Sequence, residues 1–200
     1  MGTEPRGGRE PEAKGRILRA AIAEYAERGR AGVRIEHVAA RASVNKALVY
    51  RYFGDRDALF DAAMREVFSS RLTLLEDLPD TLEGTMKLWA ERFRRDPMFL
   101  RMIVREAIEG DPSRPAERTL RREYYRRQID QVAGFQASGE LPREADPEYL
   151  FLALLGLLAV PMMLPQIARL VSGRGPEGRA FSEGWDRAIA AVAGALREGD

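Results

Sequence analysis

Residues 34–59 read RIEHVAARASVNKALVYRYFGDRDAL, and this stretch decides the predicted fold. Its apolar residues recur three and four positions apart, which indicates two very short helices, over 35–41 and 45–53. A three-residue turn, 42–44, joins them, and the Gly-Asp pair after the second helix can end it and cap the next one. Two short helices joined in this way and packed on a longer first helix are typical of a helix-turn-helix.

The second short helix has the size of a rod that enters the major groove of DNA. At 1.5 Å per residue its length is roughly 13 Å. One of its faces is apolar and can pack inward, together with apolar residues of the preceding helix and turn. The residues predicted to point inward are Val38, Val44, Val49 and Phe53.

The outer and flanking faces of this helix carry side chains that suit contact with DNA. Asn45 can cap the helix, because its side-chain oxygen can accept a hydrogen bond from the first turn. Lys46 and Arg51 can reach base edges or phosphates, and Ala47 and Leu48 offer apolar contact to a thymine methyl group. The hydroxyls that can donate to phosphate are those of Tyr50 and Tyr52.

The charge of the chain is unevenly distributed. The 200 residues include 32 Lys and Arg against 31 Asp and Glu, a net charge of +1 that suggests no partner. Residues 1–56 hold 12 basic and 7 acidic residues, a net of +5, whereas residues 57–200 carry a net of −4. A small basic segment on a larger acidic body is expected when only that segment meets a polyanion.

Several function classes are excluded by composition. There is no cysteine and one histidine, His37, so disulfides, Cys-based zinc sites and sites with two imidazoles are ruled out. We find no phosphate loop, nucleophile elbow or carboxylate constellation of known spacing, so the sequence predicts no enzyme, no metal site and no cofactor. His37 is therefore expected to be structural or to face solvent.

The rest of the chain also shows helical spacing, without strand signals, and predicts an all-α protein of about nine helices. The expected parts are a disordered tail over 1–12, a helix-turn-helix domain of three helices over 13–58, and a helical bundle over 59–200. The N-terminus lacks the apolar core of a secretory signal, and the apolar run 150–164 is shorter than a spanning helix. We expect a soluble, cytoplasmic protein without membrane contact.

Residues 16–29 and 38–59 resemble the tetracycline-repressor (TetR) family of bacterial transcription regulators. The most specific part of the resemblance is the pattern Val-x-x-x-x-Val-Tyr-x-Tyr-Phe over 44–53, followed by Lys/Arg-Asp/Glu-x-Leu over 56–59. The resembling residues cover about a quarter of the chain. Outside them, the likeness is limited to length and helical architecture.

Some positions depart from the family pattern. Ser43 and Ala47 stand where the family commonly has glycine. Either Ser43 is left-handed, which would cost of order 1 kcal/mol, or the turn takes a different conformation. Arg34 stands where a Thr or Ser usually caps the second helix, so that cap is lost. Arg34 could instead reach a phosphate, and so could Arg56, which replaces the usual lysine.

The resemblance implies a homodimer that binds a palindromic double-stranded DNA operator, acts as a repressor and is released by a small-molecule effector. Independently, the apolar segments 150–164 and 181–196 would expose too much surface in a monomer, which favours a four-helix dimer interface. The body is rich in Met and aromatic side chains, which are often plain core but also suit an apolar or aromatic effector. The candidate pocket residues are Met86, Trp89, Phe93, Met102, Glu106, Tyr125 and Phe151.

A second class of function stays open from the residues alone. The chain could be a helical binding or scaffold protein whose N-terminal segment no longer reads DNA, and Ser43 and Arg34 are the features that favour this alternative. Screening against random DNA duplexes would separate the two hypotheses.

Overall fold

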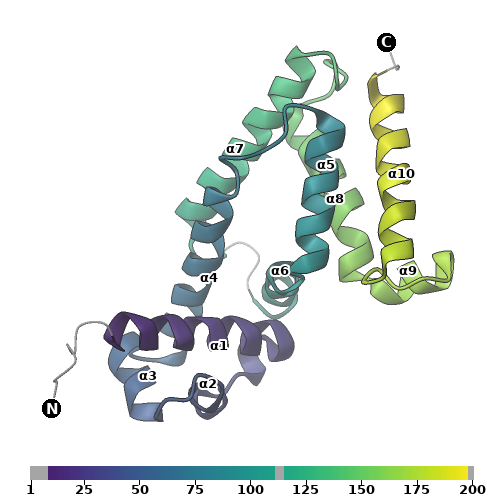
Figure 1. The fold of residues 1–200 in the computed structure, drawn as a ribbon. Helices are drawn as coiled ribbons and strands as arrows, with labels where there is room; N and C mark the ends of the chain where they lie inside the picture. The colour runs from purple at the N-terminus through teal and green to yellow at the C-terminus, as the bar shows by residue number, and fades with distance from the viewer. Residues whose placement is uncertain (1–8, 111–114, 198–200) are drawn as a thin grey trace, which may run out of the picture. The chain divides into compact units, whose positions relative to one another are not determined.

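The computed structural model describes residues 9–110 and 115–197. Within these ranges the chain forms ten helices and no strand, which confirms the all-α prediction (Figure 1). The helices are α1 (Arg9–Gly32), α2 (Ile35–Arg41), α3 (Lys46–Phe53), α4 (Arg56–Thr73), α5 (Leu82–Arg95), α6 (Met98–Glu109), α7 (Arg118–Ala137), α8 (Pro147–Met163), α9 (Pro165–Ser172) and α10 (Arg179–Arg197).

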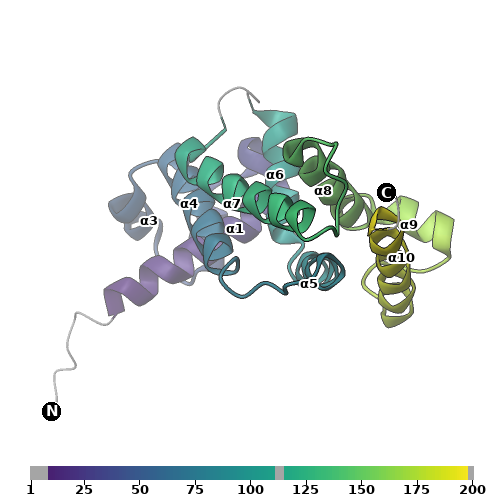
Figure 2. The ribbon, with the colours of Figure 1, turned by 90° about the horizontal axis from the view of Figure 1, so that it is seen from above.

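The helix beyond the expected nine is α9, which follows α8 directly. Pro165 has no N–H and disfavours helical geometry in the residue before it, and Leu164 accordingly has φ −122° and ψ 60°. The chain therefore bends by 84° between α8 and α9 (Figure 2). No single helix among the described residues is long and apolar enough to cross a bilayer, and α8 reaches that length only with α9, as this bent pair.

Contacts divide the chain into two compact units. Residues up to 70 form the N-terminal unit together with 101–120, and residues 71–100 form the C-terminal unit together with 121–200. This division differs from the expected boundary between residues 58 and 59, because most of α4 shares the N-terminal core. Its residues Leu59 and Phe60 are both buried there.

The core of the N-terminal unit forms along the apolar stripe of α1. Ile17, Ala21 and Tyr25 are buried, as their spacing predicts. The Tyr25 ring meets Phe60 of α4 edge-on at 4.9 Å, and its hydroxyl donates a 2.8 Å hydrogen bond to the carbonyl oxygen of Arg56. Burial raises the pKa of Tyr25, so this hydroxyl stays protonated. The first helix and the start of α4 are thus joined by packing and by a buried donor.

The beginning of α1 corrects one expectation. We expected a disordered tail over 1–12, but α1 begins at Arg9, while residues 1–8 lie outside the described part of the chain. Pro11 is tolerated because the first turn of a helix has N–H groups without helical partners. Glu12 pairs with Arg16 one turn later at 3.3 Å, and Ala13 is buried. Local pairing and one buried contact therefore extend the helix into this segment.

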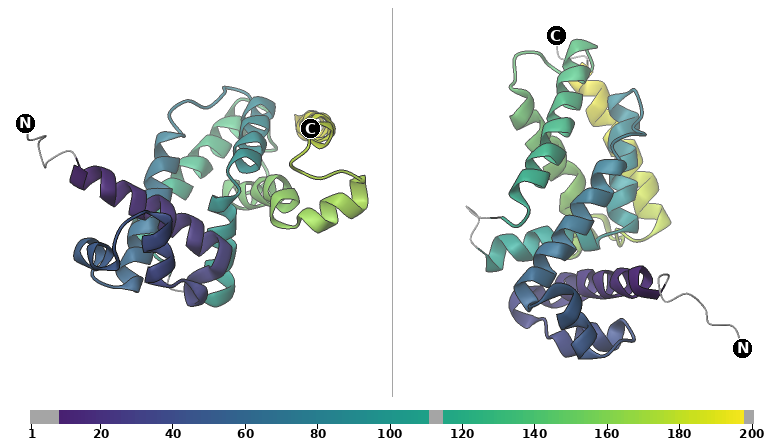
Figure 3. Two further views of the ribbon diagram at one scale, coloured as in Figure 1. Left: turned by 60° about the horizontal axis from the view of Figure 1, so that its bottom comes forward. Right: turned by 90° about the vertical axis from the view of Figure 1, so that its left-hand side faces the viewer.

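The C-terminal unit is built on α5. Its stripe Leu82, Met86, Trp89 and Phe93 is buried, as the spacing predicts. This helix packs against both α8 and α10, and α10 runs along it in Figure 3 (right). The side chain of Thr81 caps α5 by accepting a 3.2 Å hydrogen bond from the N–H of Gly84.

The turn between α2 and α3 leads to a first prediction. Ser43 has φ 55°, a left-handed conformation that glycine adopts without steric cost. Ser43→Gly is therefore expected to raise the free energy of unfolding by about 1 kcal/mol in urea denaturation. The matched control is Ala40→Gly in the helical part of α2, which should lower it by about 0.5–1 kcal/mol. Equal shifts for the two variants would contradict the strain at Ser43.

Candidate nucleic-acid interface

The eight-residue helix α3 is fixed at both ends. The Asn45 side chain accepts a 2.7 Å hydrogen bond from the N–H of Leu48, which confirms its predicted capping role. At the other end Gly54, with φ 83°, donates its N–H to the carbonyl oxygen of Tyr50 at 2.8 Å. Asp55 then caps α4 by accepting from the N–H of Ala58 at 2.8 Å. Local bonds therefore define where this helix starts and stops.

One side of α3 packs inward and the other lies at the surface. Val49 is 1% exposed and Val38 of α2 is fully buried, whereas Val44 and Phe53, also predicted to point inward, are half-buried. Two of the predicted DNA-contacting residues, Leu48 and Tyr52, are half-buried as well. The other predicted contact residues are exposed, and they are Arg34, Asn45, Lys46, Ala47, Tyr50, Arg51 and Arg56.

Lys46 of α3 has an acidic and an aromatic neighbour that we did not predict from the sequence. Its ammonium group forms an ion pair with Glu36 of α2 and stands 5.6 Å from the ring centre of Tyr50. The hydrogen bond to Glu36 raises the pKa of Lys46, and the same bond lowers the pKa of the Glu36 carboxyl. Lys46 is therefore a fully charged cation that already has one anionic partner.

Arginines extend the cationic character beyond this lysine. The Arg51 guanidinium stands 5.3 Å from the ring centre of Tyr52 on α3. Arg34 precedes α2 and makes no side-chain capping bond, as its replacement of a capping residue predicts. Arg56 opens α4, and its backbone carbonyl is the group that accepts from Tyr25.

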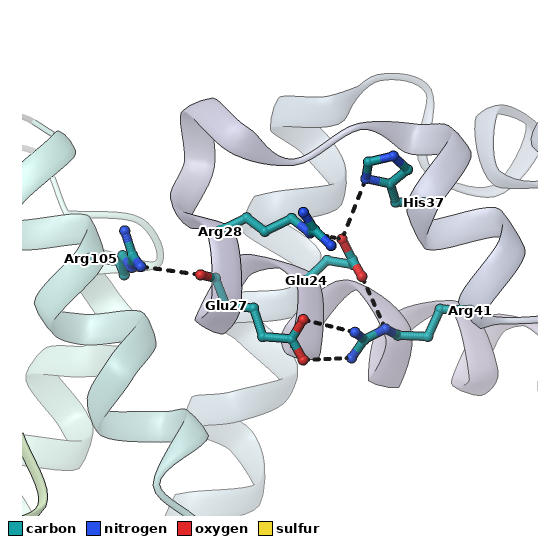
Figure 4. A network of polar contacts seen from close by, with 6 residues as sticks. All are labelled: Glu24, Glu27, Arg28, His37, Arg41 and Arg105. Atoms are coloured by element: carbon teal, nitrogen blue, oxygen red, sulfur yellow. Dashed lines mark hydrogen bonds and ion pairs between the residues drawn. The ribbon is translucent and has the colours of Figure 1, made fainter.

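A polar network joins α1 to α2 behind the helix-turn-helix (Figure 4). The Glu24 carboxylate, 3% exposed, is paired with Arg28 at 2.9 Å and with Arg41 at 3.0 Å. Arg41 also holds Glu27 with two hydrogen bonds, of 2.8 and 3.0 Å, and this bonding lowers the pKa of the Glu27 carboxyl. His37 lies 3.8 Å from Glu24 with its side chain 44% exposed, in line with a structural or solvent-facing residue.

The C-terminal unit contains an apolar cavity of about 50 Å³ among α5, α7 and α8. Its lining includes four of the predicted pocket residues, Met86, Trp89, Phe93 and Phe151. The polar side chains in the lining are Thr85, Gln128 and Gln131, and none of its residues is charged. The remaining lining residues are Leu82, Val132, Phe135, Leu154, Leu155 and Leu158.

The other three predicted pocket residues lie elsewhere. Tyr125 contacts the cavity-lining Phe151, with ring centres 6.0 Å apart, but does not line the cavity. Met102 is buried and belongs to the N-terminal unit. Glu106 accepts a 3.0 Å hydrogen bond from the N–H of Ala116, which precedes α7.

From α7 we predicted only Tyr125 as a pocket residue, whereas Gln128, Gln131, Val132 and Phe135 are the α7 residues that line the cavity. Five of the 20 residues of α7 are arginines, which obscures its inward face. Gln128, Val132 and Phe135 nevertheless recur at spacings of four and three, and this minor stripe is the signal that could have revealed its inward face. Amphipathic periodicity is weak here because two of the buried residues in α7 are glutamines.

Large apolar side chains remain exposed on α8 and α9 of the single chain. Leu170 and Val171 of α9 are 85% and 83% exposed, and Tyr149 and Leu152 of α8 are exposed too. A second cavity, of about 390 Å³, lies among α8, α9 and the start of α10, and it is lined mainly by apolar residues. Exposed apolar surface of this kind marks an interaction site more often than a solvated face.

Comparison with known proteins assigns both parts of the chain. Residues 17–63 match the family described as bacterial regulatory proteins, tetR family. Residues 85–197 match the tetracyclin repressor-like C-terminal domain, so this second match alone spans more than half of the chain.

Individual relatives agree with the family matches. The chain is 32% identical over 172 residues to the HTH-type transcriptional repressor SCO4008 of Streptomyces coelicolor, covering 85% of this chain and 89% of the relative. Among solved structures, the fold is similar to that of SCO4942 of the same organism, with a TM-score of 0.74 and 22% identity over 90% of this chain and 97% of that one. AibR, solved in complex with isovaleryl coenzyme A and operator DNA, has a TM-score of 0.67 and 18% identity over 92% and 97% of the two chains.

Proposed function

Because this chain belongs to the TetR family of bacterial regulatory proteins, a non-enzymatic family of DNA-binding transcriptional regulators, we propose that it is a ligand-responsive repressor. In this proposal a homodimer binds a palindromic operator and a small molecule releases it. The alternative is a scaffold protein that no longer reads DNA, favoured by Ser43 and Arg34; α3 forms with its cap at Asn45 in place despite both residues.

The observation that carries the DNA-binding part is the exposed face of α3. Asn45, Lys46, Ala47 and Arg51 are exposed, while the helix is anchored through Val49 and its two capped ends. Such a face offers a cation, a guanidinium fork and a small apolar contact to base edges in a major groove. The tyrosine hydroxyls, Arg34 and Arg56 are then available to phosphates, which position the protein without specifying sequence.

Dimerisation follows from the length of this helix and from the exposed apolar surface. A helix of eight residues reads only a few base pairs, so useful specificity needs a second copy related by a twofold axis. The two helices must reach successive major grooves, roughly 34–36 Å apart. The exposed apolar residues of α8 supply the apolar part of the surface that we propose for the dimer, and the outer face of α10, whose large apolar residues Phe181 and Ile189 are buried, lies beside it in this proposal.

The cavity among α5, α7 and α8 is the proposed effector site. Since its lining has apolar, aromatic and amide side chains without a charge, we propose an uncharged, largely apolar or aromatic effector with a group that hydrogen-bonds Gln128 or Gln131. The polyanionic coenzyme A portion of a ligand such as that of AibR would have no countercharge in this cavity.

The small size of the cavity indicates how binding can be coupled to release. A volume of about 50 Å³ is far below the 300 Å³ or more typical of small-molecule sites. An effector must therefore displace lining side chains or helices, and it binds best to a conformation in which α5, α7 and α8 are further apart. A ligand that prefers one conformation shifts the protein toward it, which is the energetic requirement for control of DNA binding.

Loss of either cation on α3 tests the proposed interface. Lys46→Ala and Arg51→Ala are each expected to weaken binding to a duplex selected from a random-sequence library by about tenfold. Both side chains are exposed, so the free energy of unfolding should change by less than about 0.5 kcal/mol. Mobility-shift titrations and thermal denaturation measure the two effects. Unchanged binding by both variants would refute the residue assignment.

The salt dependence of binding is measured in the same titrations with the unsubstituted protein. A dimer that makes about eight phosphate contacts should give a slope of log K against log salt near −7. A slope near zero is incompatible with a phosphate-dominated interface. The complex should contain two chains per duplex.

The ion pair between Lys46 and Glu36 predicts a variant that binds DNA more tightly. Glu36→Gln removes a negative charge beside the interface and releases Lys46, so DNA binding should strengthen by about threefold. The matched control is Glu123→Gln on α7, which removes an equal charge from a carboxylate paired with Arg126 and Arg127. If both variants bind DNA with the same affinity, Glu36 has no specific role at the interface.

The effector site is tested by filling the cavity. Leu155→Trp places a large ring in the lining, whereas Ile108→Trp places the same ring at an exposed position of α6, away from the cavity lining. The neutral dye N-phenyl-1-naphthylamine should bind the unsubstituted protein and accept energy from Trp89. We expect Leu155→Trp to lower dye affinity at least about tenfold and Ile108→Trp to leave it unchanged. Equal dye binding by the two variants would place the site outside this cavity.

A further inference from the structure

The first helix is interrupted near its end. Gly29 has φ 69° and ψ 176°, so the residues on its two sides do not share one helical ladder. In a continuous helix the N–H of Ala31 would donate to the carbonyl oxygen of Glu27, four residues earlier. The interruption separates these two groups, and each needs another partner.

Both groups find their partner on α6. The N–H of Ala31 donates to the carboxylate of Glu109 at 3.3 Å. The carbonyl oxygen of Glu27 accepts a 3.1 Å hydrogen bond from the Arg105 guanidinium, as Figure 4 shows. Arg105 and Glu109 are one turn apart on α6, and their charged groups lie 3.6 Å from each other. One acidic and one basic side chain thus replace a single missing backbone hydrogen bond.

The approach of Glu109 depends on the absence of a side chain at residue 29. A Cβ atom built on Gly29 would lie 1.8 Å from the nearer carboxylate oxygen of Glu109, well inside van der Waals contact. Glycine is therefore required here twice, for its positive φ and for this close approach. The Glu109 side chain is only 23% exposed as a result.

The end of α1 that α6 contacts also holds α2 in place. The same Glu27 whose carbonyl oxygen accepts from Arg105 holds Arg41 of α2 through its carboxylate. Val33 and Ile35, which follow the break and lead into α2, are buried. A change in the contact between α6 and the break would therefore change how α2, and with it α3, is held.

We propose that Arg105 and Glu109 are positioning residues for DNA recognition, acting as a clamp on the break in α1. The clamp touches no DNA in this proposal, which rests on the proposed DNA binding of α3. An exposed ion pair by itself contributes little to stability. This pair differs because each member also satisfies a backbone group that the break has left without its helical partner.

The experiment compares Glu109→Ala, Glu109→Gln and Arg105→Ala. Glu109→Ala removes the acceptor for Ala31, so amide exchange over residues 29–33 should accelerate about tenfold or more and binding to the selected duplex should weaken at least about threefold. Glu109→Gln keeps an acceptor oxygen and should restore most of the affinity. Arg105→Ala should weaken binding too, and the double Ala variant should lose less than the sum of the single losses.

The control is Glu123→Ala on α7, which removes the same charge from a carboxylate paired with Arg126 and Arg127. Loss of a negative charge favours binding to DNA by general electrostatics, so weakening by Glu109→Ala has the opposite sign from that effect. The salt slope should stay that of the unsubstituted protein, because no phosphate contact is lost.

Two results would overturn the clamp. One is unchanged amide exchange over residues 29–33 in Glu109→Ala, and the other is a DNA affinity of that variant equal to that of Glu123→Ala. If the unsubstituted protein binds no duplex at all, the proposed function fails instead. In that case amide exchange over residues 29–41 is the remaining test of the clamp. Faster exchange in Glu109→Ala supports the clamp, and unchanged exchange overturns it.

Discussion

A helix of eight residues is not stable alone in water, and α3 has to keep its outer face free of the packing that would otherwise hold it. Its stability must therefore come from its ends and from the helices behind it. Asn45 and Gly54 fix the ends, Val49 fixes the inner face, and the carboxylates of Glu24 and Glu27 tie α2 to α1. Because these contacts hold the helix, Lys46 and Arg51 can stay exposed on its outer face.

The C-terminal unit meets a different constraint, an excess of apolar surface. The buried stripe of α5 provides a core, yet Leu170 and Val171 of α9 and Leu152 of α8 stay exposed in the single chain. In the proposed function, partner binding and effector binding both place apolar groups against apolar helix faces. The uncharged cavity lining and the exposed face of α8 are thus two outcomes of one composition.

Prediction from the sequence succeeded where the signal is local. The cap at Asn45 and the missing cap at Arg34 depend on residues within a few positions of each other. Prediction was incomplete where distant segments decide the result. Glu106, a candidate pocket residue, does not line the cavity among α5, α7 and α8, and its carboxylate accepts a hydrogen bond from the N–H of Ala116. Gln128 and Gln131 of α7 were missed because a lining position depends on which helix packs opposite.

The all-α class, the helix-turn-helix and the basic character of the N-terminal segment could be predicted from the amino-acid sequence, because helix periodicity, capping and charge are properties of short stretches of chain. The folded chain was needed to see that Lys46 pairs with Glu36, which residues enclose the cavity, and that side chains of α6 bond to the break at Gly29. Those outcomes join residues as far as 78 positions apart. No periodicity specifies which side chain fills such a gap, since that depends on the packing of whole helices.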